Sequence, residues 1–196
     1  LIKLNATQGL TGTLPAVSGA NLTNLSAGLT LLSTTNFSGS ASNTEISLDH
    51  SSHENFLLIC DYLEGSSSGS GENCDVIFKR AGQSSFNTGS TDYGFGGSLH
   101  DTGTDFNVNQ QNTMEIFRGS APNCEFNFVM FLVGVGNTTS YSSIHTQLNK
   151  VDLGGGQSSY MINGCFYSTE RVTDMQFSFT AGNVTKLQAK LYGLEE

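Results

Sequence analysis

Residues 174–180 read Asp174-Met175-Gln176-Phe177-Ser178-Phe179-Thr180 and alternate between large apolar and polar side chains. In an extended chain successive side chains point to opposite faces, so Met175, Phe177 and Phe179 would share one face. This pattern is typical of a β-strand with one face in a core and the other in water. It predicts a half-buried strand whose Phe177 and Phe179 anchor the core.

The same period of two recurs on both sides of this segment. Residues 186–193 place Leu187, Ala189 and Leu191 opposite polar neighbours. Further runs bounded by turn-forming residues lie at 45–49, 56–63, 75–80, 113–118, 125–133, 143–151 and 160–167. Two of these runs, 56–63 and 126–133, are apolar on both faces, which predicts central strands in a sheet covered on both sides.

The composition agrees with a chain of strands and turns. Ser, Thr, Asn and Gly make up 85 of the 196 residues. These residues disfavour helices, because the first three compete for backbone hydrogen bonds and glycine costs a helix about 1 kcal/mol. We therefore expect residues 35–196 to form an all-β head domain, an antiparallel jelly-roll-like β-sandwich.

Residues 1–34 differ from the rest of the chain and are predicted to form an extended N-terminal arm. Their leucines follow neither a helical nor a strand period, and several glycines and a proline interrupt them. Such a segment has no core of its own, so its apolar side chains need a partner surface, either the head domain or copies of the same arm. We expect copies of the chain to meet there. The predicted interface leucines are Leu10, Leu14, Leu22, Leu25 and Leu29.

Charge and hydropathy argue against two classes of partner. The net charge is −9, and the eight basic residues are scattered along the sequence, so we expect no binding to nucleic acid. The densest apolar run, 126–135, is about half the length of the roughly 20 residues that a membrane helix needs. We therefore expect no membrane insertion.

Short motifs of known enzymes occur without their context, so we predict no catalytic residues and no enzyme activity. Residues 65–69 match G-x-S-x-G, but no helix is predicted after them. The triplet 101–103 reads Asp-Thr-Gly once, whereas an aspartic protease needs two carboxylates. Asp105, Asn107 and Asn109 match the start of a calcium loop that lacks its glycine and its bidentate glutamate.

The sequence predicts no cofactor and no metal site. His50 and His53, flanked by two acids, are weak metal candidates, and an exposed corner between two strands explains them better. The spacing of the four cysteines fits no zinc motif. Cys60 and Cys165 lie in apolar runs and are predicted to be buried free thiols.

Both ends of the chain resemble bacteriophage fibre proteins. Residues 9–25, GLTGTLPAVSGANLTNL, are similar to a fibre segment of the form LPAxxGxxLTxL. Residues 182–184 and 190–194, which read GNV and KLYGL, are similar to the closing strand of fibre and related virion domains. The resemblance implies a virion structural protein assembled in the host cytoplasm. It also implies a homotrimeric tail fibre whose N-terminal side joins other virion proteins and whose β-sandwich head binds the host surface.

Within this resemblance, a host-surface glycan or protein would be the ligand of the head. Exposed aromatic rings stack on sugars, and this suits a chain with few charges. Four aromatic residues lie in glycine-rich or serine-rich stretches where exposure is expected, although each could equally be a sandwich-edge residue. The receptor-binding candidates are Tyr93, Phe95, Tyr141 and Tyr160.

Two other functions stay open at this point. A capsid decoration or head-fibre protein would use the arm to hold capsid subunits while the β domain projects. A carbohydrate-degrading tail enzyme would need a pair of carboxylates in a groove, and the sequence shows no persuasive pair.

Overall fold

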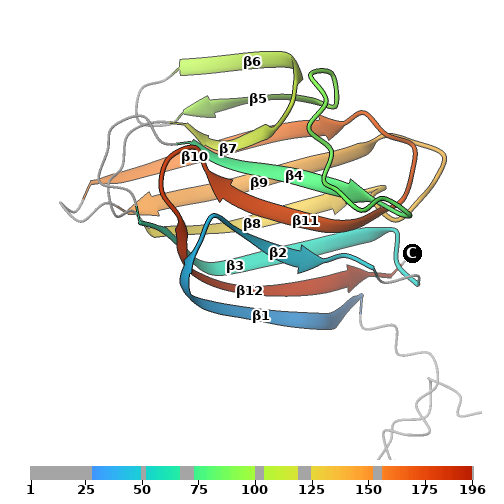
Figure 1. The fold of residues 1–196 in the computed structure, drawn as a ribbon, viewed down its shortest axis with the longest axis horizontal. Helices are drawn as coiled ribbons and strands as arrows, with labels where there is room; N and C mark the ends of the chain where they lie inside the picture. Colours follow the sequence, from blue (N-terminus) through green and yellow to red (C-terminus); the bar gives the residue numbers. More distant parts are fainter. Residues whose placement is uncertain are drawn as a thin grey trace, which may run out of the picture.

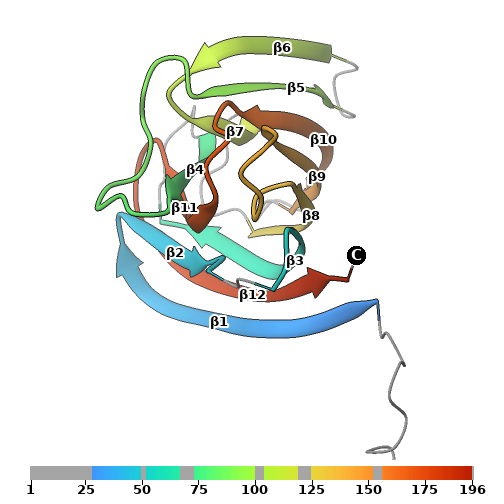
Figure 2. The same cartoon turned by 90° about the vertical axis from the view of Figure 1, so that its right-hand side faces the viewer.

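The computed structural model of the chain describes residues 28–49, 52–66, 73–99, 104–118, 125–151 and 156–195. These residues form twelve β-strands and no helix, so none of them belongs to a helix that could span a membrane. The strands build two antiparallel sheets that pack face to face (Figures 1 and 2). The predicted all-β antiparallel sandwich is confirmed.

The larger sheet has eight strands and the smaller sheet has four. In spatial order, the larger sheet contains β1 (Leu29–Ala41), β12 (Val184–Leu194), β3 (Asn55–Gly65), β8 (Glu125–Val133), β9 (Ser142–Val151), β10 (Gln157–Phe166), β5 (Tyr93–Leu99) and β6 (Thr104–Gln111). The smaller sheet contains β2 (Asn43–Ser47), β11 (Val172–Phe179), β4 (Asn73–Arg80) and β7 (Met114–Arg118). The chain crosses between the sheets repeatedly, so both contribute to one core.

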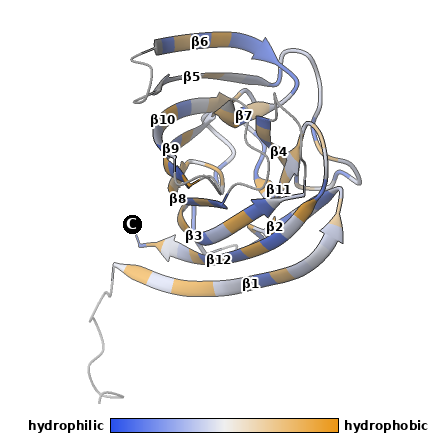
Figure 3. Cartoon of the chain, turned by 90° about the vertical axis from the view of Figure 1, so that its left-hand side faces the viewer, coloured by the Kyte–Doolittle hydropathy of each residue, from blue (hydrophilic) through white to orange (hydrophobic). Residues whose placement is uncertain are grey.

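The core lies between the two sheets and is rich in aromatic rings. Phe177 on β11 is fully buried and packs on Phe128 of β8, with ring centroids 5.6 Å apart. The ring of Phe179 packs on that of Phe126, with centroids 5.9 Å apart. The predicted inward faces of 174–180 and 186–193 are both buried. Along β1 and β6 the alternation appears as bands of hydrophobic and hydrophilic colour (Figure 3).

One expectation about the central strands is wrong. β3 and β8 are central in the larger sheet, as predicted, but the four-stranded sheet covers only one of its faces. Val129, Phe131 and Val133 of β8 therefore remain exposed on the outer face. An apolar run shows that the side chains on both faces of a strand are hydrophobic. It does not show whether another part of the protein covers both faces, and the smaller sheet covers only one.

Three strands, β1, β5 and β6, were not among the predicted runs. β1 begins at Leu29, within the predicted arm, and pairs with β12. β5 contains Gly94, Gly96 and Gly97, which hide the strand pattern. A β-carbon at Gly97 would lie 2.3 Å from the backbone oxygen of Met161, so close strand contact requires glycine there.

Several sequence expectations fall partly or wholly outside the described residues. Of the five interface leucines, Leu10, Leu14, Leu22 and Leu25 lie outside them, and Leu29 is exposed at the start of β1. Cys60 is a buried free thiol, as predicted, and burial raises its pKa to about 12. Cys165 is also free but only half buried.

Candidate binding groove

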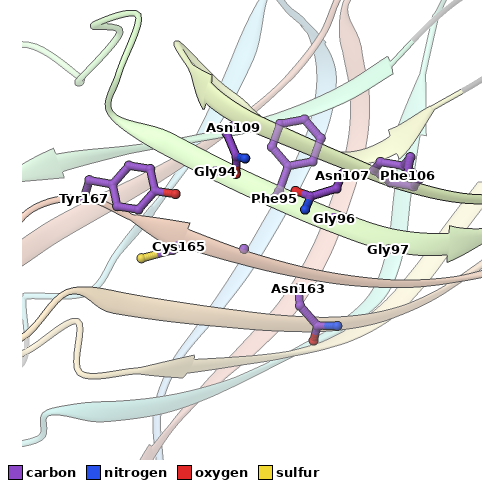
Figure 4. A pocket seen from close by; sticks show the side chains of 11 residues that line it. Gly94, Phe95, Gly96, Gly97, Phe106, Asn107, Asn109, Asn163, Cys165 and Tyr167 are labelled. Atoms are coloured by element: carbon purple, nitrogen blue, oxygen red, sulfur yellow. The ribbon is translucent and has the colours of Figure 1, made fainter.

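A shallow groove of about 450 Å³ lies at one end of the outer face, where β10, β5 and β6 are neighbours (Figure 4). The outward side chains of Asn107 and Asn163 reach it because each strand alternates between the core and this face, and Phe95 contributes to its lining although its ring faces the core. Its lining residues are Gly94, Phe95, Gly96, Gly97, Phe106, Asn107, Asn109, Asn163, Gly164, Cys165 and Tyr167.

Glycines on β5 create the floor of the groove. Gly96 pairs with Asn163 on one side and with Asn107 on the other, so two amide side chains flank a position without a side chain. A β-carbon at Gly94 would lie 2.2 Å from the hydroxyl oxygen of Tyr167. Glycine at this position therefore lets the Tyr167 side chain lie across the strand.

Three asparagine amides provide the polar groups of the groove. The Asn163 Oδ1 atom lies 2.8 Å from His145 Nδ1, and because this oxygen accepts, the imidazole donates and the Asn163 NH₂ group is left for other partners. The side chains of Asn107 and Asn109 form no hydrogen bond with the described part of the chain. Each amide can therefore both donate to and accept from a ligand.

Two exposed tyrosines stand at the β10 end of the groove. Tyr167 is 40% exposed and Tyr141 is 57% exposed, and their rings meet edge to face with centroids 5.8 Å apart. Tyr167 directly follows β10, and Tyr141 lies in the connection from β8 to β9. They form an accessible aromatic wall.

The lining of the groove carries no formal charge. Its only titratable groups are the Tyr167 phenol and the Cys165 thiol, and burial raises the pKa of that thiol above its ordinary value. The described residues contain no group of three or more His, Cys, Asp or Glu side chains that could hold a metal ion. Of the weak metal candidates, His50 lies outside these residues, and His53 packs beside Phe56. The groove therefore suits an uncharged, polar ligand.

Comparison with known proteins assigns the chain to no family. No family model, no curated protein and no solved structure matches the chain.

The expectation that all four aromatic candidates are exposed is wrong for Tyr93, Phe95 and Tyr160. All three point into the core, because 93–99 and 157–166 are strands whose alternate side chains face the smaller sheet. The Tyr93 hydroxyl lies 2.8 Å from the backbone nitrogen of Phe78, whose N–H donates to it. Tyr141 alone of the four is exposed, and the structure places it beside Tyr167.

Sequence reasoning missed the groove residues Asn107, Asn109, Asn163 and Tyr167. A signal was present for two of them, because Asn107 and Asn109 alternate with Phe106 and Val108 as in a half-buried strand. The spacing of Asp105, Asn107 and Asn109 also matches the start of a calcium loop, which obscures the strand pattern. No local signal shows that Asn163 lies two strands away from Asn107 across Gly96.

A second polar cluster on the outer face brings two carboxylates together. Glu64 and Glu125 are cross-strand partners, and the Tyr62 hydroxyl oxygen lies 2.9 Å from Glu64 Oε2 and 2.6 Å from Glu125 Oε1. Desolvation raises the pKa of Glu64, but the hydrogen bonds from Lys186 and Tyr62 outweigh it and lower that pKa overall. A glycoside hydrolase needs one acid with a raised pKa, so Glu64 does not suit the acid role.

Proposed function

We propose that this chain is the host-binding head of a trimeric bacteriophage tail-fibre protein and that it binds, without catalysis, a neutral glycan on the host cell surface. The observation that carries the proposal is the uncharged groove with its asparagine amides and its exposed tyrosine pair. The fibre-like sequences at both ends of the chain support the location in a virion.

The chemistry of the groove matches that of a sugar. Sugar hydroxyls both donate and accept hydrogen bonds, as do the amides of Asn107 and Asn109, and the NH₂ group of Asn163 can donate to a sugar oxygen. A pyranose ring also presents C–H groups that pack on an aromatic ring, and Tyr167 and Tyr141 offer such rings. Because the lining carries no formal charge, a neutral saccharide is preferred over an anionic one.

The shallow shape of the groove implies weak binding at a single site. In a homotrimer three such grooves would engage a cell surface together, and linked sites gain avidity without new contacts. The N-terminal side of the chain, which resembles a fibre shaft, would join the other virion proteins. This arrangement explains how a groove of modest depth could support attachment.

We expect Tyr167→Ala and Asn107→Ala each to weaken glycan binding about fivefold, because each removes a contact of about 1 kcal/mol. The double variant should abolish adsorption to host cells. The measurement is binding of fluorescently labelled protein to an array of bacterial polysaccharides and to cells of the host bacterium. Periodate cleaves vicinal diols of sugars, so treating the host cells with it should abolish binding of the unaltered protein.

Asn36→Ala is the matched control, because Asn36 is an exposed asparagine on β1 at the opposite edge of the same sheet. Gly94→Ala is a second test of the groove, since the new β-carbon must displace the Tyr167 hydroxyl. Unchanged adsorption by the Tyr167 and Asn107 variants would contradict the proposed site. A protein that coats the capsid and has no affinity for cells would instead support the decoration function.

A further inference from the structure

The groove continues beyond β10 as two further hollows on the outer face of the larger sheet. The second hollow, of about 200 Å³, lies over β8, β9 and β10 and shares Asn163 with the groove. The third, of about 440 Å³, lies over β3, β8 and β9 and shares Val129 and Gln147 with the second. We use the name outer track for the groove and these two hollows together. Beyond Asn163 it is bordered by Phe131, His145, Met161, Gln147, Asn127 and Asp61.

Strand register joins the groove to the second hollow in one row. Phe131 of β8 pairs with His145 of β9, and His145 pairs with Asn163 of β10. Asn163 and Asn107 then flank Gly96 in the groove (Figure 4). Neighbouring strands lie about 4.8 Å apart, so the six strands from β6 to β3 span about 24 Å. The outer track is therefore long enough for a chain of several sugars.

The second hollow combines an aromatic ring with polar groups. Phe131 is 44% exposed and Met161 is 54% exposed, and the exposed side chains of His145 and Gln147 lie between them on β9. The Gln147 amide forms no hydrogen bond with the described part of the chain. A sugar ring has an apolar C–H face and a hydroxyl edge, so it can pack on Phe131 while Gln147 bonds a hydroxyl.

The third hollow carries further amides, which hydrogen bonds hold in place. Asn149 Nδ2 donates to Asn127 Oδ1 at 3.3 Å, and the Ser159 hydroxyl donates to Asn149 Oδ1 at 3.0 Å. These bonds leave the NH₂ group of Asn127 for another partner. Each part of the outer track therefore offers amide groups to a ligand that has many hydroxyls.

The charges along the outer track favour a neutral ligand. Asp61 is the one acidic side chain among the described residues that line it, and it forms an ion pair with Lys190 at 3.0 Å. Just beyond the β3 end, Glu64 and Glu125 lie with a single lysine, Lys186. A polyanionic chain would therefore be repelled at this end.

We infer that the outer track binds an extended, neutral oligosaccharide whose successive sugars cross the strands from β6 towards β3. The inference rests on the proposed function and adds the class of ligand, which is a linear polysaccharide segment and not a single terminal sugar. A terminal sugar would occupy the groove alone, and its affinity would not depend on the length of the chain attached to it.

The test is calorimetric titration of the full chain with neutral oligosaccharides, from monosaccharide to hexasaccharide. These are made by partial acid hydrolysis of the neutral bacterial polysaccharide that the protein binds on the array. We expect the association constant to rise at least about tenfold from disaccharide to hexasaccharide, because the longer chain adds the contacts of the second and third hollows. Calorimetry reports the affinity of each site, so avidity does not contribute.

Variants in the two added hollows should affect only the longer chains. Phe131→Ala with Gln147→Ala is expected to weaken hexasaccharide binding at least about tenfold and to leave disaccharide binding unchanged. Asn127→Ala should weaken hexasaccharide binding about fivefold. By contrast, Tyr167→Ala in the groove should weaken binding of both lengths.

Asn36→Ala with Gln188→Ala is the matched control. Both are exposed amides on the same face, paired across β1 and β12, and they line a hollow that shares no residue with the outer track. This variant should bind every length as the unaltered chain does.

Circular dichroism establishes that each variant is folded, and if the Phe131 and Gln147 double variant does not fold, Asn127→Ala decides. An association constant that does not rise with chain length would overturn the inference and leave the proposed function standing. So would unchanged hexasaccharide binding by the folded variants of the two added hollows. If no oligosaccharide of any length binds, the proposed function falls and the inference with it.

Discussion

Replacing Phe177 by Ala is expected to lower the free energy of unfolding by about 3–5 kcal/mol. The Phe177 side chain is fully buried on β11, and its ring packs against Phe128 of the opposite sheet with centroids 5.6 Å apart. Removing the ring loses the transfer free energy of its apolar atoms and leaves a cavity between two sheets that cannot close without moving backbone.

Urea unfolding followed by circular dichroism measures this loss. Tyr141→Ala is the control, because it truncates an aromatic ring that is mostly in water, and we expect a change within about 0.5 kcal/mol. Phe179→Ala should also destabilise strongly, since Phe179 is buried against Phe126. Unchanged midpoints for both phenylalanine variants would mean that the β11 side chains do not anchor the core.

The second large effect is a fall in the stability of the fold with rising pH, and it depends on Asp75. Asp75 on β4 faces Glu115 on β7 across the strand pair, and its Oδ1 atom has no hydrogen-bond partner among the described residues. Burial, together with the charge of Glu115, raises the pKa of Asp75 from 3.8 to about 7. The folded chain therefore holds this proton more tightly than the unfolded chain does.

The sign of the pH dependence follows from this difference. Below about pH 4 Asp75 is protonated in both the folded and the unfolded chain, so it does not lower the free energy of unfolding. As the pH rises from about 4 to about 7, only the unfolded chain releases the proton readily, so stability falls by an amount on the order of 4 kcal/mol. Above about pH 7 this loss is complete.

Asp75→Asn should remove the decline and make the protein more stable than the unaltered chain above neutral pH. Urea midpoints measured across the acidic and neutral range test this expectation. Asp105→Asn is the matched control, because Asp105 is an exposed aspartate on β6, and it should leave the decline in place. A profile for Asp75→Asn that parallels that of the unaltered chain would contradict the role of Asp75.

Much of the strand content could be predicted because the relevant signal is local. A period of two in 174–180 and 186–193 identified both the strand and the buried face. The same rule does not identify β5, where three glycines leave no alternation of side chains, or β6, whose alternating residues also match the start of a calcium loop. β1 was missed because its first residues share the composition of the preceding segment.

The candidate site could be predicted only in part. Tyr141 was found because serine-rich connections are usually exposed. Tyr93, Phe95 and Tyr160 were expected to be exposed for the same reason, but they lie in strands and face the core. Glycine and serine within a strand resemble a loop in sequence, and only strand pairing distinguishes the two.

The sequence by itself determined that this protein is built of half-buried strands and which side chains of most strands turn inward, because neighbouring side chains in an extended chain must alternate. The tertiary structure decided which strands are neighbours and which faces are covered. It placed Asn163 and Asn107 on either side of Gly96 and left Phe131 exposed. These outcomes depend on pairing between residues far apart in the chain and on a smaller sheet that covers only one face of the larger, and no local pattern encodes either.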